Sequence, residues 1–179
     1  MKWLLILIIL AVVAVLILAS RKPNSFRVER KILIHAESAT VFAYINDFHQ
    51  WTHWSPWENI APNLTRSYSG PDMGVGAHYA WQGNKNMGQG NMTILESTPH
   101  SFIKIALQFI KPFAANNIAE FTLTQQGDNT EVAWAMYGPS PLISKVMGLF
   151  INMDKMIGTQ FETGLTNLKN AAEKAKQSI

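Results

Sequence analysis

The chain has 179 residues, which is enough for one globular domain, and carries 15 Lys and Arg against 12 Asp and Glu. Cysteine is absent, which excludes disulfide scaffolds and cysteine-based zinc or redox centres. Apolar residues make up 47% of the chain, and one uninterrupted run at 3–19 accounts for the excess over an ordinary soluble domain. This composition excludes repeat, collagen-like, disordered and multi-pass membrane proteins.

The apolar run at 3–19 predicts a helix that spans a membrane. As a helix it extends roughly 25 Å, and Lys2 and Arg21 at its ends can reach the two membrane faces. A cleaved signal peptide is the alternative, although bulky Leu18 makes the cleavage site poor, and a buried helix is a third. We expect residues 1–20 to form a single-pass anchor, in the inner membrane if the source is bacterial. The side on which the domain lies stays open.

Residues 21–25 predict a short basic linker, followed by one domain at 26–179. Residues 32–179 contain nine Lys and Arg against eleven Asp and Glu, so the positive charge gathers just after the apolar run. Basic side chains at that place attract anionic lipid headgroups. The domain itself lacks a basic stripe, so we expect no nucleic acid among its partners.

Alternating apolar and polar residues predict a first strand over 26–36, although Arg30 falls on its apolar side. Ser38 suits a helix N-cap, and apolar residues follow it at helical spacing up to Phe48. This helix is short, because a tryptophan-rich segment that runs to Pro56 interrupts it.

From 64 to 138 the chain alternates strand-like segments with clusters of Gly, Pro, Asn and Asp. Closely spaced strands joined by such turns are typical of an antiparallel meander. We expect six strands, at 64–69, 76–82, 89–97, 101–111, 117–126 and 130–137.

Apolar residues then recur every three or four positions from Ile143 to Ala172, which predicts helix with one apolar stripe. An unbroken helix of that length would exceed the domain, so we expect a break between Gly148 and Gly158. The remaining long helix has to cover the apolar face of the sheet. The prediction is therefore an α+β fold, in which a strand, two short helical segments, six strands and a long helix follow one another. A curved seven-stranded antiparallel sheet wraps around that last helix.

Several motifs resemble those of the START-like superfamily, also called SRPBCC, which has the helix-grip fold. They are FRVERKILIHA at 26–36, VFAYINDF at 41–48, WTHWSPW at 51–57, YSGP at 68–71, GVGAHYAWQGN at 74–84 and FETGLTNLK at 161–169. The resemblance covers roughly residues 26–175 and is to the polyketide cyclase/dehydrase and lipid-transport group, in which many members also begin with an apolar span. It implies a cavity between sheet and C-terminal helix, but the superfamily uses that cavity for lipid carriage, hormone binding, cyclisation and hydroxylation.

A cavity lined by aromatic and methionine side chains suits a small apolar or lipid-like molecule. We therefore expect a membrane-anchored domain that binds such a molecule, without a cofactor and with its oligomeric state left open. The alternatives are a cyclase or dehydratase acting on an apolar substrate, and a non-catalytic interaction module whose own side chains fill the cavity. The residues expected to line the ligand site are Trp54, Tyr79, Trp81, Met92, Ile105, Leu107, Phe121, Trp134, Met136, Met147, Phe150, Met153, Ile157 and Phe161.

Asp154 is the weak catalytic candidate, because it falls beside the apolar stripe, where burial would raise its pKa. Capping of the broken helix is the simpler role for this residue. His49 and His53 are four residues apart, but no Glu lies between them and no third ligand is evident, so we expect no metal site.

The tryptophans at 51, 54 and 57 have two alternative roles. They could line the mouth of the cavity and contact a ligand or the membrane interface. They could instead plug one end of the core, which the family resemblance favours.

Overall fold

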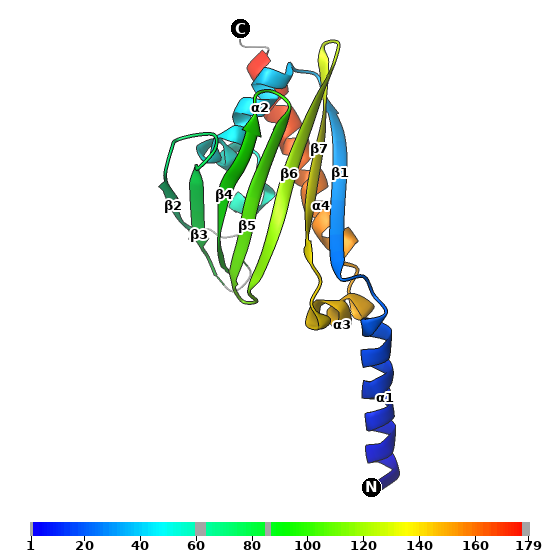
Figure 1. Cartoon of the computed structure of the whole chain (residues 1–179). Coiled ribbons are helices and arrows are strands. Elements are labelled where there is room, and N and C mark those ends of the chain that lie inside the picture. Colours follow the sequence, from blue (N-terminus) through cyan, green and yellow to red (C-terminus); the bar gives the residue numbers. More distant parts are fainter. Residues whose placement is uncertain (1, 60–63, 85–86, 177–179) are drawn as a thin grey trace.

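The computed structural model describes residues 2–59, 64–84 and 87–176. A curved sheet wraps around one long helix, and another helix projects from the domain at the N-terminus (Figure 1). The elements are α1 (Lys2–Ser20), β1 (Ser25–Ile34), α2 (Ser38–Asn46), the 3-10 helices η1 (Phe48–His53) and η2 (Pro56–Asn59), β2 (Thr65–Ser69), β3 (His78–Gln82), β4 (Gln89–Thr98), β5 (Phe102–Lys111), β6 (Ala115–Gln126), β7 (Asn129–Pro139), α3 (Leu142–Phe150) and α4 (Met153–Lys176).

The seven strands form one antiparallel sheet in the order β1-β7-β6-β5-β4-β3-β2. The first strand pairs with the last over its whole length, from Ser25 opposite Pro139 to Ile34 opposite Thr130. The predicted α+β helix-grip fold is confirmed, and each strand begins and ends within two residues of its predicted bounds.

One expected helix cap is wrong. Glu37 occupies the N-cap position of α2, and Ser38 is the first helical residue. The backbone N–H of Ser38 donates to Gln125 Oε1 at 2.7 Å. A side chain at the end of β6 therefore satisfies one of the free N–H groups of this helix, a role that only the folded sheet makes available.

The C-terminal helical region breaks within the predicted interval. α3 ends at Phe150, α4 begins at Met153, and the N–H of Lys155 donates to Asn152 Oδ1 at 2.9 Å. α4 lies along the inner face of the sheet, whereas α3 lies across the end of the domain beside α1 (Figure 1). The prediction of a single apolar stripe is therefore wrong for its first part.

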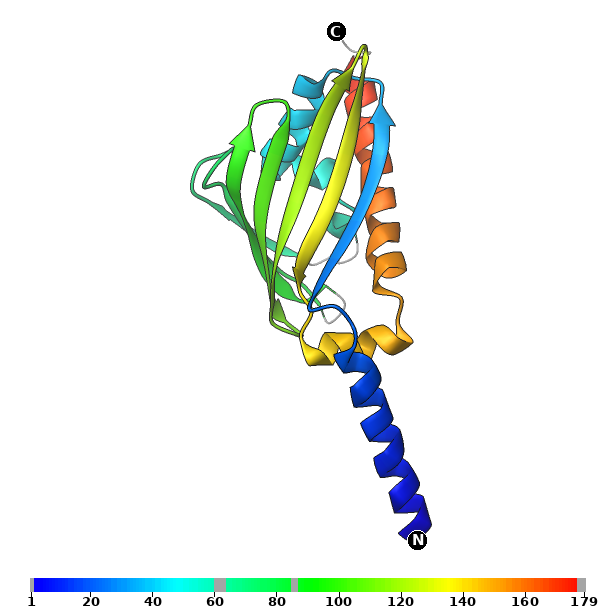
Figure 2. The same cartoon turned by 45° about the vertical axis from the view of Figure 1, so that its right-hand side comes forward.

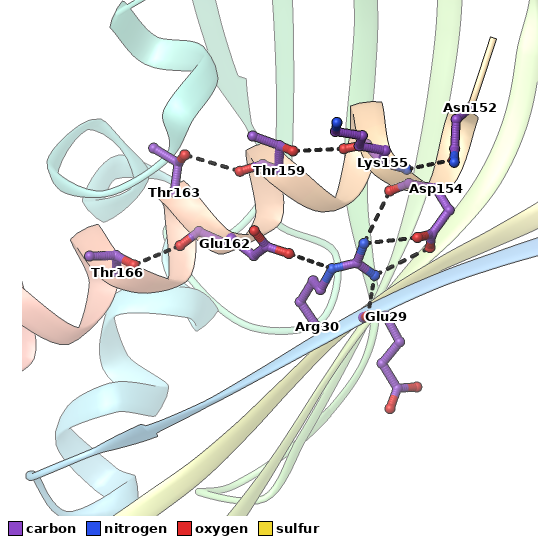
Figure 3. A network of polar contacts seen from close by, with 9 residues as sticks. All are labelled: Glu29, Arg30, Asn152, Asp154, Lys155, Thr159, Glu162, Thr163 and Thr166. Carbon is purple, nitrogen blue, oxygen red and sulfur yellow. Dashed lines mark hydrogen bonds and ion pairs between the residues drawn. The ribbon is translucent and has the colours of Figure 1, made fainter.

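Two glycines allow α4 to lie close to the sheet. At Gly164 an added Cβ would lie 2.8 Å from the ring of Trp134, and at Gly158 it would lie 2.0 Å from Arg30 Nη2. The Arg30 guanidinium lies against Gly158. It donates hydrogen bonds to Asp154 and Glu162, which come before and after that glycine in α4 (Figure 3). It contacts Asp154 Oδ2 at 2.9 Å and Glu162 Oε1 at 2.7 Å.

α1 runs away from the sheet and from α4, and nearly all its side chains are exposed (Figure 2). By length and composition it could cross a membrane, and a signal sequence would have the same composition. A core helix of a soluble domain would instead be covered by other elements, whereas within α1 the buried residue is Ala19, next to the linker.

Gly158→Ala is expected to gain little of the roughly 1 kcal/mol by which alanine favours a helix over glycine. The new Cβ displaces the Arg30 guanidinium and breaks its bonds to α4. An Arg30→Ala background removes the three atoms nearest to the new Cβ, so there the same change should raise the free energy of unfolding by about 0.5–1 kcal/mol. The free energy of unfolding is measured for the unmodified protein, the two single variants and the double variant. Each full chain is unfolded with urea in lipid nanodiscs and followed by tryptophan fluorescence. An equal effect of Gly158→Ala in both backgrounds would contradict this contact.

Candidate functional site

An aromatic cluster occupies the centre of the space between the sheet and α4. Trp134 of β7 stacks on Phe161 of α4 with 4.1 Å between ring centroids, and on Phe121 of β6 at 5.0 Å. Trp54 and Trp57 meet the Trp134 ring edge-on, at 5.5 and 5.6 Å. The cluster therefore joins the sheet, α4 and the η1–η2 segment in one apolar contact.

Two of the tryptophans also bind the end of α2 through their indole N–H groups. Trp54 Nε1 donates to the carbonyl of Tyr44, and Trp51 Nε1 donates to that of Ile45, each at 2.9 Å. Carbonyls in the last turn of a helix lack a partner within that helix. Trp51 and Trp54 are buried in the core, while Trp57 is half-buried.

The indole of Trp134 differs from these two. Its Nε1–H is buried and has no hydrogen-bond partner among the described residues. A buried donor left unpaired costs roughly 1–3 kcal/mol, which gives this N–H a strong tendency to bind any acceptor atom that reaches it.

The covering of the apolar interior varies along the domain, and partly exposed core side chains away from α1 include Ile32, Tyr44 and Tyr68. Far from α1, inward side chains such as Ile34 and Leu168 are fully buried. At the end nearest α1, Phe26, Leu107 and Ile157 pack against the core but keep part of their surface exposed. The covering of the interior by α4 is therefore incomplete where the domain meets α1.

A hollow of about 360 Å³ opens at this same end, where β6 and β7 part beyond the pairing of Ile118 with Tyr137. Leu107 and Pro139 also line it. A smaller hollow of about 190 Å³ lies on the outer face of the sheet, among charged side chains that include Glu120. Both lie outside the aromatic cluster, which its own rings occupy.

The structure brings most of the predicted ligand-site residues together. Leu107 and Ile157 are partly buried against the core, and Met153 is half-buried at the start of α4. Met147 and Phe150 lie apart from the others and are 36% and 75% exposed, because α3 packs against α1 and not against the sheet. The buried members are Trp54, Tyr79, Trp81, Met92, Ile105, Phe121, Trp134, Met136 and Phe161.

Asp154 lies outside the interior, with 61% of its side chain exposed. The hydrogen bond from Arg30 holds the pKa of Asp154 below its ordinary value, so the expected rise by burial is wrong. The capping role is also wrong, because Asn152 accepts the hydrogen bond at the start of α4 (Figure 3). An ionised carboxylate paired with a guanidinium is unsuited to donating a proton, and Asp154 instead helps to attach α4 to β1.

Glu58 is a buried acid at the edge of the sheet. The spacing of apolar residues in the sequence does not predict its role, because that role depends on partners elsewhere in the sequence. The side chain of Glu58 in η2 is 6% exposed, pairs with Arg66 at 2.5 Å and accepts a hydrogen bond from the Tyr79 hydroxyl at 3.0 Å. Burial, together with the charge of Glu58, raises the pKa of Tyr79 well above its ordinary value. The phenol stays protonated, and the three groups fasten η2 to β2 and β3.

The histidine pair considered for a metal site has other contacts. His49 Nδ1 lies 2.8 Å from Asp47 Oδ1, and its ring stacks on Tyr68 at 4.2 Å. Within residues 2–59, 64–84 and 87–176, no three His, Cys, Asp or Glu side chains gather as a set of metal ligands.

The model of the polyketide cyclase / dehydrase and lipid transport family matches residues 25–173. The chain belongs to this family. Similar solved structures include a protein of unknown function from Staphylococcus aureus, with 11% identity, a TM-score of 0.64 and coverage of 86% of this chain and 96% of that one. A protein from Chromobacterium violaceum has 16% identity and a TM-score of 0.58, with coverage of 85% of this chain and 99% of that one. The Aha1 dimer from Colwellia psychrerythraea has 17% identity and a TM-score of 0.57, with coverage of 83% of this chain and 96% of that one. At such identities the likeness shows the fold.

No curated protein matches the chain. Membership of the polyketide cyclase/dehydrase and lipid transport family confirms the predicted resemblance and suggests a ligand-binding domain.

For this family member, Trp54→Phe is expected to lower the free energy of unfolding more than Trp134→Phe. Both changes remove the same part of an indole from one cluster, but only the first leaves a helix carbonyl without its donor. The two losses in the free energy of unfolding should differ by about 1 kcal/mol. Urea unfolding measures both variants, and equal losses would contradict the asymmetry of the two N–H groups.

Asp154→Asn is expected to destabilise the protein at neutral pH by an amount that shrinks on acidification. A carboxylate whose pKa is lowered by folding stabilises the protein above its unfolded pKa of about 3.9, and this contribution disappears as the pH falls through the folded pKa. Unfolding free energies measured from about pH 7 down to pH 3 test this. Asp128→Asn, in the exposed β6–β7 turn, is the control and should show no such convergence with the unmodified protein.

Proposed function

We propose that this protein is a membrane-anchored ligand-binding domain that takes a small apolar or lipid-like molecule into the end of its interior nearest α1. Residues 26–179 form the domain, and residues 3–19 hold it in a membrane by a single pass. The ligand reaches the domain from the bilayer, into which molecules of this kind partition.

The uneven covering of the interior carries this proposal. Side chains such as Ile34 and Leu168, far from α1, are fully buried, whereas Phe26, Leu107 and Ile157, near α1, are partly exposed on the side of the larger hollow. Ligand pockets commonly have volumes of about 300–1,000 Å³ and mainly apolar linings. An apolar site that is open toward a membrane favours a molecule delivered by lipid over one delivered by water.

Adaptable side chains lie between the hollow and the aromatic cluster. Met136 belongs to the core and faces Ala119 of β6 across the strand pair. Methionine is unbranched and fills irregular gaps, so it can change rotamer at little cost. Movement of this side chain and of Leu107 makes room for a ligand without displacement of the stacked rings. Each Å² of apolar ligand surface buried there contributes about 25 cal/mol.

The Trp134 N–H supplies the polar contact of the proposed site. Gly138, four residues after Trp134 on β7, lines the hollow. The Trp134 N–H is therefore roughly 13 Å from the hollow along the strand. A molecule with an extended apolar chain and one acceptor atom, such as a fatty acid, covers that distance. Binding would then give the N–H the partner that it lacks.

An interaction module with a filled interior is the second candidate. The close stacking of Trp134 on Phe161, and the position of both hollows outside the cluster, favour it. The two candidates differ in whether an apolar molecule enters the domain.

A diazirine-bearing fatty acid, added to nanodiscs that hold the full chain, distinguishes them. After irradiation, peptide mass spectrometry is expected to find cross-links at the α1-proximal ends of β5, β6 and β7. Leu107→Trp fills the hollow and should reduce these cross-links at least about tenfold, equivalent to about 1.4 kcal/mol.

Leu95→Trp is the matched control, because this leucine of β4 is 45% exposed and does not line the hollow. It should leave the cross-links unchanged. Cross-links confined to α1 and α3 in the unmodified protein would reject the ligand-binding proposal and favour the filled module.

A further inference from the structure

α3 presents its apolar side chains outward and its lysine inward. Leu142, Ile143 and Phe150 are 51%, 61% and 75% exposed, while Lys145 is 8% exposed. A surface helix of a domain surrounded by water has the opposite arrangement, with its apolar face on the core. The outer face of α3 therefore suits an apolar environment.

Hydrogen bonds to the linker after α1 hold α3 in this orientation. Lys145 Nζ donates to Asn24 Oδ1 at 2.6 Å, and the carbonyl of Asn24 accepts from the N–H of Ser140 at 2.7 Å. Lys22 Nζ donates to the carbonyl of Gly148. A rotation that turned the apolar face of α3 toward the domain would break these bonds and would carry the Lys145 ammonium away from its partner.

The direction of α3 relative to α1 gives the outer face a specific neighbour. Both views show α3 running across the end of α1 at the point where α1 meets the domain (Figures 1 and 2). A bilayer crossed by α1 would have its surface at this level. α3 would then lie in the plane of the membrane interface, as interfacial amphipathic helices do.

The β5–β6 connection projects from the same end of the sheet. It exposes 67% of Phe113 and 42% of Ile110, with Lys111 between them in the sequence. Arg21 is exposed where α1 ends. Exposed apolar side chains flanked by basic ones complement the headgroup layer of an anionic bilayer, which offers acyl chains below and negative charge above.

We infer that α3 and the β5–β6 connection form a second membrane contact, seated in the headgroup layer of an anionic bilayer beside α1. This inference rests on the proposed function for the crossing of the membrane by α1. The contact fixes the tilt of the domain and holds the larger hollow close to the lipid.

Single-cysteine labelling of the full chain tests the contact, since the protein has no native cysteine. Phe150→Cys and Ile143→Cys report on α3, and their exposed side chains can be replaced without disturbing the core. Met73→Cys is the matched control, 59% exposed in the β2–β3 connection at the opposite end of the sheet, and Leu10→Cys reports on α1. Each variant is placed singly in nanodiscs of mixed zwitterionic and anionic phospholipids, where a charged maleimide reaches both membrane faces.

Labelling of the two α3 variants is expected to be at least about tenfold slower than labelling of Met73→Cys, because the headgroup layer covers their thiols. A fluorophore on the Phe150→Cys thiol should also be quenched by lipids brominated in their acyl chains, which separates cover by lipid from cover by protein. Rapid labelling of the α3 variants with protection of Leu10→Cys would overturn the inference and leave the anchor intact. Rapid labelling of Leu10→Cys would reject the anchor itself.

Discussion

The interior of this domain depends on the contact that α4 makes with the sheet at two positions where the helix has no side chain. Gly164 admits the ring of Trp134, and Gly158 admits the guanidinium of Arg30. The first contact sets the distance at which Trp134 and Phe161 stack, and so holds the η1–η2 segment against the sheet. The second adds hydrogen bonds from β1 to α4 at the end near α1, where the apolar contact is incomplete. A methyl group at Gly164 would meet a rigid ring, whereas one at Gly158 would meet the movable end of a side chain.

The ion pairs that join the described elements of the domain lie at the edges of its interior. Arg30 directs its guanidinium to Asp154 and Glu162, both of them mostly exposed, and Glu58 is paired with Arg66 at the sheet edge. Among the described residues, the centre holds the aromatic rings and the unpaired N–H of Trp134. This arrangement favours binding by burial of apolar surface with a single polar contact. Proton-transfer chemistry would need a titratable group at the centre, and the acid expected there, Asp154, is held ionised at the rim.

Periodicity suffices to predict the strands and the core-facing stripe of α4, because the alternation of apolar residues records which face of an element is buried. It fails for α3 for the same reason. An apolar residue every three or four positions predicts one apolar face, but it does not distinguish a face that packs on protein from one that stays exposed, so Ile143 and Phe150 are indistinguishable from core residues. The environment of Asp154 depends on Arg30, which is 124 residues away in the chain. The bonds from Trp51 and Trp54 to α2 are local in sequence, yet they depend on how the chain turns after Asn46.

Many of the exposed apolar side chains lie on α1 and at the end of the domain that meets it, which makes these separate features parts of one arrangement. α1 is apolar and exposed, α3 and Phe113 are exposed beside its end, inward side chains near it such as Phe26 are half-covered, and others far from it such as Ile34 are sealed. Single exposed apolar residues elsewhere, such as Met73, are ordinary for a soluble protein, but a continuous series of them is not. In water this end of the molecule would promote aggregation. Against a bilayer the same surface is solvated by acyl chains, and a lipid-like molecule would pass from membrane to hollow, and from hollow to the Trp134 N–H, without crossing water. In the proposed arrangement, the orientation of the domain on the membrane would determine access to the site as much as the site's own lining would.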